Sequence, residues 1–128
     1  MEIERKFTVE SLPADLDSYP FRIIEQAYLN TAPVIRIRRE DDSFYLTYKG
    51  KGLMAREEYN LPLDRASYEH LLPKADGACI SKKRYLIPCP PYTIELDIFA
   101  EPFAPLIIAE VEFPSVEMAD SFTPPSWF

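Results

Sequence analysis

The chain is poor in the residues that most metal and redox sites in small proteins use. It has one histidine, His70, and two cysteines, Cys79 and Cys89, among its 128 residues. Two cysteines are too few for a disulfide framework, and they lack the spacing and the histidine partners of a zinc site. We therefore expect free thiols, and we expect no catalytic triad built on several histidines.

Glycine is scarce as well, since only three glycines occur. Two of them flank Lys51, and the segment Gly50-Lys51-Gly52 invites comparison with a phosphate-binding loop. It lacks the Lys-Ser/Thr pair and the following helix that such a loop needs. The sequence therefore predicts a turn between two strands at this place.

Long apolar runs and an excess of basic residues are also missing. No apolar run reaches the length of a membrane span, and Glu2 and Glu4 stand where a signal peptide would carry basic residues. We expect a cytoplasmic protein with no membrane partner. The formal net charge is −7, and nucleic acid is not an expected partner because a duplex binds to a basic face.

Charged residues are plentiful, and their spacing is regular. Glu2, Glu4 and Lys6 stand two residues apart, so they point to one face of a strand. The same spacing recurs in Arg36 and Arg38, Lys49 and Lys51, Arg56, Glu58 and Asn60, Lys82 and Arg84, Glu95 and Asp97, and Glu110 and Glu112. A single row of this kind is usually a solvated strand face or a set of cross-strand pairs. Its recurrence predicts a closed sheet with charged side chains inside.

These alternating positions hold a large share of the basic residues. They carry eight of the 14 Lys and Arg residues but only seven of the 21 Asp and Glu residues. An acidic protein that concentrates its cations in one cavity is expected to bind an anion of high charge density there. The predicted partner is therefore a small polyanion.

Eight segments have the composition and spacing of strands. They are residues 1–9, 21–29, 34–39, 44–49, 54–63, 78–87, 92–99 and 106–113. Eight antiparallel strands, nearly all connected by hairpins, can close into a barrel that holds one small ligand. The predicted fold class is mainly β with a few helices, in a single domain.

The apolar residues of the predicted strands, such as Ile35, Ile94 and Val111, fall on the outward phase. Because they cannot all face water, we expect helices and loops to cover the barrel. Helices are predicted at 64–73, where Asp64 is the N-cap, and at 116–122, where Ser115 is the N-cap.

The ordered set of motifs resembles the CYTH family, also called triphosphate tunnel metalloenzymes. Glu2, Glu4 and Lys6 match the family's opening Glu-x-Glu-x-Lys pattern. The later matches come in the family's order: VIRIR at 34–38, YLTYK at 45–49, REEYN at 56–60, KKRY at 82–85, IELDIF at 94–99 and AEVEF at 109–113. The opening motif alone is moderately specific, whereas the ordered set is highly specific.

The resemblance implies a tunnel of eight antiparallel strands, in one CYTH domain over residues 1–128 that lacks the family's C-terminal segment. It implies hydrolysis of inorganic triphosphate (tripolyphosphate) with Mg²⁺ or Mn²⁺, by a monomer or homodimer. Class IV-type adenylate cyclase and thiamine-triphosphatase activities stay open as alternatives. A module that binds polyphosphate or a nucleotide without catalysis is the non-enzymatic alternative.

The candidate site consists of inward-facing cations and carboxylates. Lysine and arginine can surround a chain of phosphates, and the predicted substrate-binding residues are Lys6, Arg36, Arg38, Lys49, Lys51, Arg56, Lys82 and Arg84. Carboxylates without His or Cys suit hard divalent cations, and the predicted metal ligands are Glu2, Glu4, Asp97, Glu110 and Glu112. The predicted catalytic residues are Glu4, Lys6, Lys82 and Glu110. Glu58, Asn60 and Glu95 are expected to complete the tunnel wall.

Several polar residues receive a structural interpretation instead. Arg5, Glu57 and Tyr48 fall on the outward phase of their strands. Tyr28 is expected in the core more than at a ligand, and Lys51 also fits an exposed turn.

Overall fold

The computed structural model describes residues 1–52 and 54–128. Its strands are β1 (Glu2–Thr8), β2 (Phe21–Thr31), β3 (Val34–Glu40), β4 (Ser43–Lys49), β5 (Ala55–Arg56), β6 (Glu58–Leu63), β7 (Asp76–Cys89), β8 (Tyr92–Phe99) and β9 (Ile107–Glu112). The helices are α1 (Arg65–Leu71) and α2 (Val116–Ser121), with the short 3-10 helices η1 (Leu16–Ser18) and η2 (Leu72–Lys74). None of the helices described is both long enough and apolar enough to cross a membrane.

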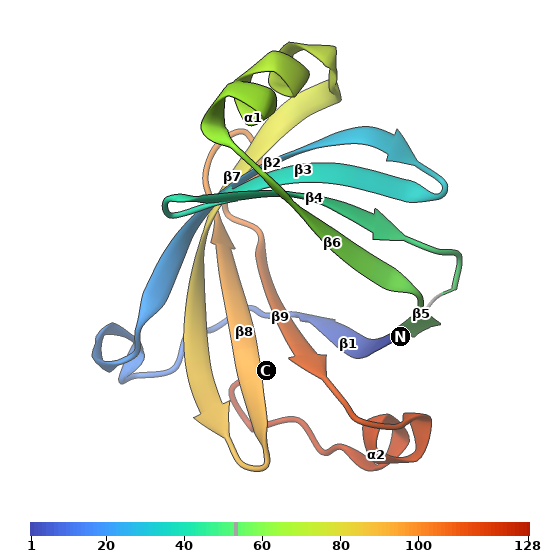
Figure 1. Cartoon of the computed structure of the whole chain (residues 1–128). Helices are drawn as coiled ribbons and strands as arrows, with labels where there is room; N and C mark the ends of the chain where they lie inside the picture. Colours follow the sequence, from blue (N-terminus) through green and yellow to red (C-terminus); the bar gives the residue numbers. More distant parts are fainter. Residues whose placement is uncertain (53) are drawn as a thin grey trace.

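The strands form one antiparallel sheet in the order β5-β1-β9-β8-β7-β2-β3-β4-β6. Its two outermost members, β5 and β6, are consecutive in the chain, so the sheet curls into a nearly closed barrel (Figure 1). The predicted antiparallel barrel is confirmed, with one difference in the number of strands. The segment 54–63 forms two strands instead of one, because β5 pairs with β1 whereas β6 pairs with β4.

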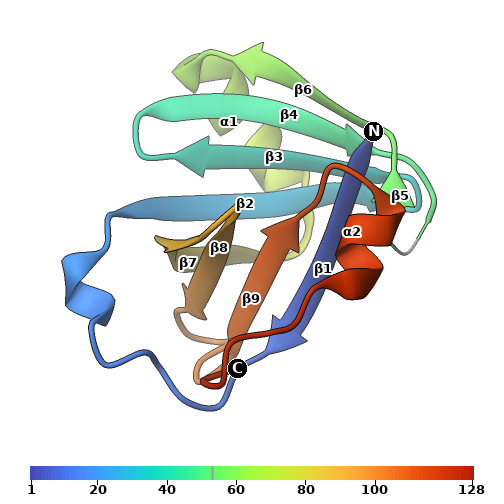
Figure 2. The same cartoon turned by 90° about the horizontal axis from the view of Figure 1, so that it is seen from below.

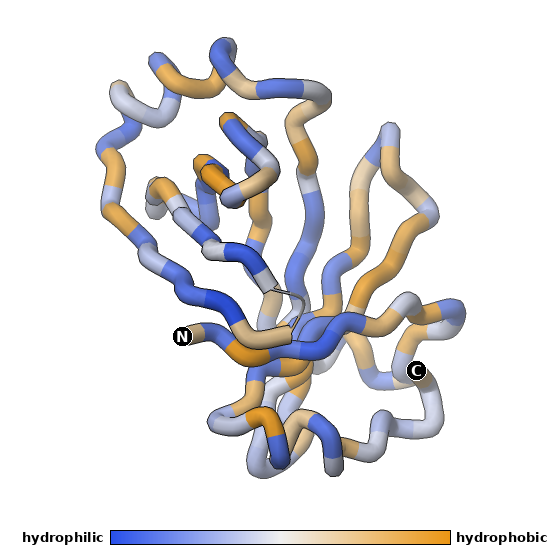
Figure 3. The backbone as a smooth tube through the Cα atoms, turned by 90° about the vertical axis from the view of Figure 1, so that its right-hand side faces the viewer, coloured by the Kyte–Doolittle hydropathy of each residue, from blue (hydrophilic) through white to orange (hydrophobic). Residues whose placement is uncertain are grey.

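The pleat of the strands separates polar from apolar side chains. Hydrophilic and hydrophobic residues alternate along the strands in Figure 3. On β1 and β9, Glu4 lies opposite Glu112 and Lys6 lies opposite Glu110. Side chains two residues apart share one face of a strand, so these charged residues form continuous rows inside the barrel.

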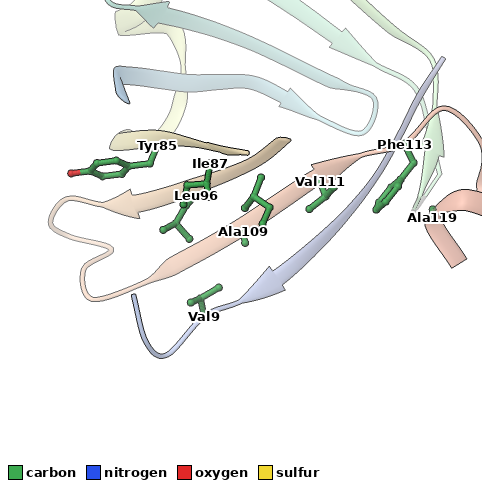
Figure 4. Packing of buried hydrophobic residues seen from close by; sticks show 9 residues of the cluster. Val9, Tyr85, Ile87, Leu96, Ala109, Val111, Phe113 and Ala119 are labelled. Carbon is green, nitrogen blue, oxygen red and sulfur yellow. The ribbon is translucent and has the colours of Figure 1, made fainter. Parts of the chain in front are cut away.

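The apolar residues that alternate with the charged rows pack on the outside of the barrel wall (Figure 4). The main cluster contains Val9, Tyr85, Ile87, Ile94, Leu96, Ala109, Val111, Phe113 and Ala119. Residues of η1 and of the C-terminal segment, such as Leu16, Phe122 and Trp127, pack against it. A second cluster joins Ala27 and Ile37 to Tyr68 of α1. The expected covering of the barrel by helices and loops is confirmed.

Both predicted helix caps are present. The Asp64 carboxylate accepts a hydrogen bond from the Ser67 backbone N–H at 2.6 Å, and the Ser115 hydroxyl accepts one from the Met118 N–H at 3.2 Å. Arg5 points outward as expected, and its guanidinium Nη1 donates to the backbone carbonyl of Ala119 at 3.0 Å. This bond ties α2 to β1.

Replacing Leu96 by alanine tests whether the outer cluster stabilises the barrel. Leu96 is fully buried, and we expect Leu96→Ala to lower the free energy of unfolding by about 2–5 kcal/mol, the usual cost of such a cavity. Leu61 is 57% exposed on β6, so Leu61→Ala should cost less than about 1 kcal/mol. Urea unfolding of both variants gives the comparison, and equal losses would contradict it.

Candidate active site

The barrel encloses a cavity of about 590 Å³. Pockets that bury a small-molecule ligand have volumes of roughly 300–1,000 Å³. Its charged lining consists of Lys6, Arg22, Arg36, Arg38, Lys49, Lys82 and Arg84, and of Glu2, Glu4, Glu40, Glu58, Glu95, Glu110 and Glu112. Seven of the 14 basic residues therefore face one space, although the chain as a whole is acidic.

The structure brings most of the predicted site residues to this cavity. Of the predicted substrate-binding residues, those that line it are Lys6, Arg36, Arg38, Lys49, Lys82 and Arg84. Of the predicted metal ligands, those that line it are Glu2, Glu4, Glu110 and Glu112. Glu58, Asn60 and Glu95 are also part of the wall. The roles of these residues stay predictions.

Lys51 and Arg56 do not belong to the cavity lining. Both line a separate pocket that also includes Met1 and Tyr48. The expected inward position of Lys51 is wrong because β4 ends at Lys49, and the alternation of a strand does not continue through a turn. Arg56 lies opposite Glu2 in the ladder between β1 and β5, so it shares the face of that cavity residue but stands outside the lining.

Asp97 is predicted from its spacing to be a metal ligand, but the structure gives it other partners. Its side chain is fully buried. Asp97 Oδ2 accepts hydrogen bonds from Lys82 Nζ at 2.6 Å and Arg84 Nη2 at 2.9 Å, and Oδ1 accepts one from Arg84 Nε at 2.7 Å. Asp97 is not part of the cavity lining, and it holds two cations toward the cavity, while its role as a metal ligand stays a prediction.

The pKa values in this trio follow from burial and ion pairing. Burial alone would raise the pKa of Asp97, but the hydrogen bonds and charge of Arg84, with the charge of Lys82, hold it below its usual value. Burial alone would lower the pKa of Arg84, and Asp97 raises it overall. Burial lowers the pKa of Lys82 to about 8, because the attraction of Asp97 offsets only part of the cost. All three groups are charged at neutral pH.

Arg36 and Arg38 differ from this trio, because neither forms a salt bridge within residues 1–52 and 54–128. Arg38 donates to the Gln26 amide oxygen through Nε and Nη2. Arg36 Nη2 donates to Thr47 Oγ1 at 3.3 Å, while its buried Nε has no partner among the described residues. Burial, and then repulsion by Arg38, lowers the pKa of Arg36. Two such guanidinium groups are suited to bind the oxygens of an anion.

Four glutamates, Glu2, Glu4, Glu110 and Glu112, are here called the glutamate cluster. Burial raises the pKa of Glu4 most, and the charge of Glu110 raises it further. Burial also raises the pKa of Glu112, and the charges of Glu2 and Glu4 add to this. Because like charges opposite each other on antiparallel strands are unfavourable, the cluster favours the binding of a cation.

Two lysines supply counter-charges within the glutamate cluster. Lys49 Nζ lies 2.7 Å from Glu2 Oε1 and 3.7 Å from Glu4 Oε1, and Lys6 Nζ lies 3.7 Å from Glu4 Oε1 and 4.0 Å from Glu110 Oε1. Lys49 is therefore the close ion-pair partner of this Glu2 oxygen. Among the described residues no three carboxylates share one coordination sphere. To bind a metal ion, the glutamates would have to move closer together, and the ion would take the place of the Lys6 and Lys49 ammonium groups.

Sequence reasoning missed several residues of the cavity wall on β2 and β3. Arg22, Gln26 and Tyr28 line the cavity from β2, and Glu40 lines it from the end of β3. The expectation that Tyr28 belongs to the core is therefore wrong. The three β2 residues stand an even number of positions apart, and this signal was available in the sequence.

Comparisons with known proteins agree with this arrangement. The model of the CYTH domain family matches residues 1–113. An inorganic triphosphatase of Nitrosomonas europaea is 38% identical over 132 residues, which cover 99% of this chain and 85% of that protein.

Solved structures show the same similarity. The crystal structure of an inorganic triphosphatase has a TM-score of 0.70 at 34% identity, over 100% of this chain and 83% of that chain. A candidate adenylate cyclase of Bacillus halodurans has a TM-score of 0.77 at 20% identity, over 94% of this chain and 84% of that one. The second comparison shows a shared fold alone.

Asp97→Asn tests the buried trio. The substitution keeps the shape of the side chain but leaves Lys82 buried without its carboxylate partner, while Arg84 keeps only Glu95 at 3.2 Å and Glu110 at 3.5 Å. Removing one partner of a buried pair costs about 3–5 kcal/mol, and we expect a loss of that size in the free energy of unfolding. Glu95→Gln is the comparison variant, since Glu95 also contacts Arg84, at 3.2 Å, but its side chain is 33% exposed. An equal loss in both variants would refute the special role of Asp97.

The pKa values also predict how stability depends on pH when metal is chelated. The pKa values of Glu2, Glu4, Glu95 and Glu112 are raised above 4.5. A carboxyl whose pKa is raised by folding contributes stability below its unfolded pKa and loses it as pH rises through the folded value. The melting temperature should therefore rise as pH falls from 7 toward 4.5.

At lower pH the opposite effect of Asp97 should take over. The pKa of Asp97 is lowered below 3.8, so its contribution is lost as pH falls through the folded value. Melting curves at a series of pH values check both parts. Glu4→Gln should reduce the rise, and an unchanged slope in that variant would contradict the assignment.

Proposed function

The chain belongs to the CYTH domain family, and on this basis we propose that it hydrolyses inorganic triphosphate to pyrophosphate and phosphate with Mg²⁺ or Mn²⁺. The observation that carries the proposal is the lack of acidic partners for Arg36 and Arg38. These two buried guanidinium groups form no salt bridge in the described residues, and they face the same cavity as the glutamate cluster. The similarity to an inorganic triphosphatase supports the choice of substrate.

Arg36 and Arg38 are the proposed anchors of the phosphate chain. Arg36 Nε is a buried donor that lacks a hydrogen-bond partner within the described structure, and an unpaired buried donor is costly. A phosphate oxygen would satisfy it. Gln26 already orients Arg38 through two hydrogen bonds, so little side-chain freedom would be lost when an anion binds.

The glutamate cluster would hold the divalent cation. Oxygen donors without His or Cys suit Mg²⁺ and Mn²⁺. When bound, such an ion neutralises phosphate charge and polarises phosphorus. The raised pKa values of Glu4 and Glu112 fit this role. We propose that Lys6 and Lys49 turn from these carboxylates toward the substrate phosphates.

The lining favours attack by water over a covalent enzyme intermediate. The described residues that line the cavity include no Ser, Thr, Cys or His side chain. Water would attack the terminal phosphorus, and the bond from that phosphorus to the bridging oxygen would break. Positioning and charge neutralisation supply most of the catalysis in phosphoryl transfer. Lys6 lies between Glu4 and Glu110. We propose that it positions the substrate phosphates on the side of the cavity that carries the glutamate cluster.

Lys82 and Arg84 are proposed to stabilise the charge that develops on the leaving pyrophosphate. Asp97 fixes both side chains, so they need no reorganisation during the reaction. Fixed charges of this kind stabilise a transition state more than mobile ones.

Phosphate release from tripolyphosphate tests the proposal, with ATP and thiamine triphosphate assayed in parallel, with and without Mg²⁺ or Mn²⁺. We expect metal-dependent turnover of tripolyphosphate. Glu4→Gln should lower kcat/KM by roughly 10–100-fold or more, as expected when a residue that supports a metal is lost. Glu10→Gln, an exposed change just beyond β1, is the matched control. Full turnover of Glu4→Gln at saturating metal would refute the metal assignment.

A further inference from the structure

One ion pair in the cavity lining has no part in the reaction proposed above. Arg22 of β2 and Glu40 at the end of β3 both line the cavity. Arg22 Nη1 lies 3.3 Å from Glu40 Oε2. The Arg22 side chain is 49% exposed and that of Glu40 is 18% exposed. The pair therefore lies where the cavity opens to solvent.

This mouth lies away from the start of β1, which carries Glu2 and Glu4. In Figure 2, β2 begins and β3 ends on the left of the molecule, whereas β1 begins on the right, where the N-terminus is marked. Arg22 lies opposite Arg84 in the ladder between β2 and β7. The row of basic side chains therefore continues from the interior of the cavity to its mouth.

The ion pair of Arg22 with Glu40 is also easier to break than the ion pairs of the basic residues deeper in the wall. The side chains of Lys82 and Arg84 are 4% and 7% exposed and are held by a fully buried carboxylate. The pair of Arg22 with Glu40 is partly exposed, and solvent weakens such a pair. A phosphate group offers Arg22 two oxygens and a higher charge than one carboxylate, so it can displace Glu40.

We propose that Arg22 is an additional phosphate subsite that selects linear polyphosphates longer than triphosphate, and that Glu40 holds it until such a chain arrives. This rests on the proposed function, in which three phosphates lie among Arg36, Arg38 and the pair fixed by Asp97. A fourth phosphate then extends toward the mouth and binds Arg22. Glu40 gives up its partner and repels the incoming chain, so it works against longer substrates.

The test compares tetrapolyphosphate with tripolyphosphate through the ratio of their kcat/KM values. Arg22→Gln should lower the ratio of tetrapolyphosphate to tripolyphosphate about tenfold, because it removes a charge-assisted contact made only by the fourth phosphate. Glu40→Gln should raise the ratio several-fold. Arg39 and Asp42 form a similar pair, with 4.0 Å between Nη2 and Oδ1, outside the cavity lining. Arg39→Gln and Asp42→Asn are therefore matched controls that should keep the wild-type ratio.

An unchanged ratio in Arg22→Gln would overturn the proposal. Equal changes in Arg22→Gln and Arg39→Gln would overturn it too, since they would show a general effect of net charge. A second measurement separates this from failure of the proposed function. With metal chelated, tetrapolyphosphate should raise the melting temperature more than tripolyphosphate does, and Arg22→Gln should lose this difference. That result would support the subsite even if the wild-type protein hydrolysed neither chain.

Discussion

The balance of charge inside a closed sheet is the constraint on which the rest of this structure depends. Charged side chains on the inner face need partners, because an unpaired charge removed from water is costly. The same alternation sends apolar side chains outward, where Leu96 and Val111 are fully buried beneath helices and loops. The barrel is therefore polar inside and apolar outside, and its main cluster of buried apolar residues lies between the wall and the outer segments.

The inner charges are balanced in two different ways. Asp97 gives Lys82 and Arg84 a permanent partner, so these cations are fixed whatever the cavity contains. Arg36 and Arg38 are buried and rely on neutral partners, Thr47 and Gln26. Strong pairing gives rigidity, while incomplete pairing leaves free energy to be gained when a ligand binds. The second kind of residue is therefore a better indicator of the proposed binding site than charge alone.

The sequence predicted most of the fold because a two-residue period survives in any regular strand. Arg36, Arg38 and Lys82 were placed in the cavity by this rule, and the structure puts them there. The rule fails where a strand ends, as at Lys51, and a residue on the correct face can still stand outside the lining, as Arg56 does. The position of Lys51 depends on the end of a strand, which a repeating pattern does not specify.

Two further features of the cavity could not be predicted from the residue spacing within one strand. The inward side of β2 mixes Arg22, Gln26 and Tyr28 with a fully buried Ile24, so it shows no charged row. The role of Asp97 depends on its register opposite Arg84 in the neighbouring strand. Pairing between strands is a tertiary property, and spacing within one strand does not reveal it. The roles of the cavity residues in catalysis stay predictions.

The place of β1 between β5 and β9 links the completion of folding to the competence to bind. The first strand to be synthesised must wait for the last one, and contacts between residues so far apart in sequence slow folding. Until β9 is made, β1 keeps an unpaired edge, which is prone to misassociation. Glu4 reaches Glu112 only when these two strands pair. A partly synthesised or partly folded chain therefore cannot assemble the glutamate cluster, and the proposed cation site arises in the same step that closes the barrel.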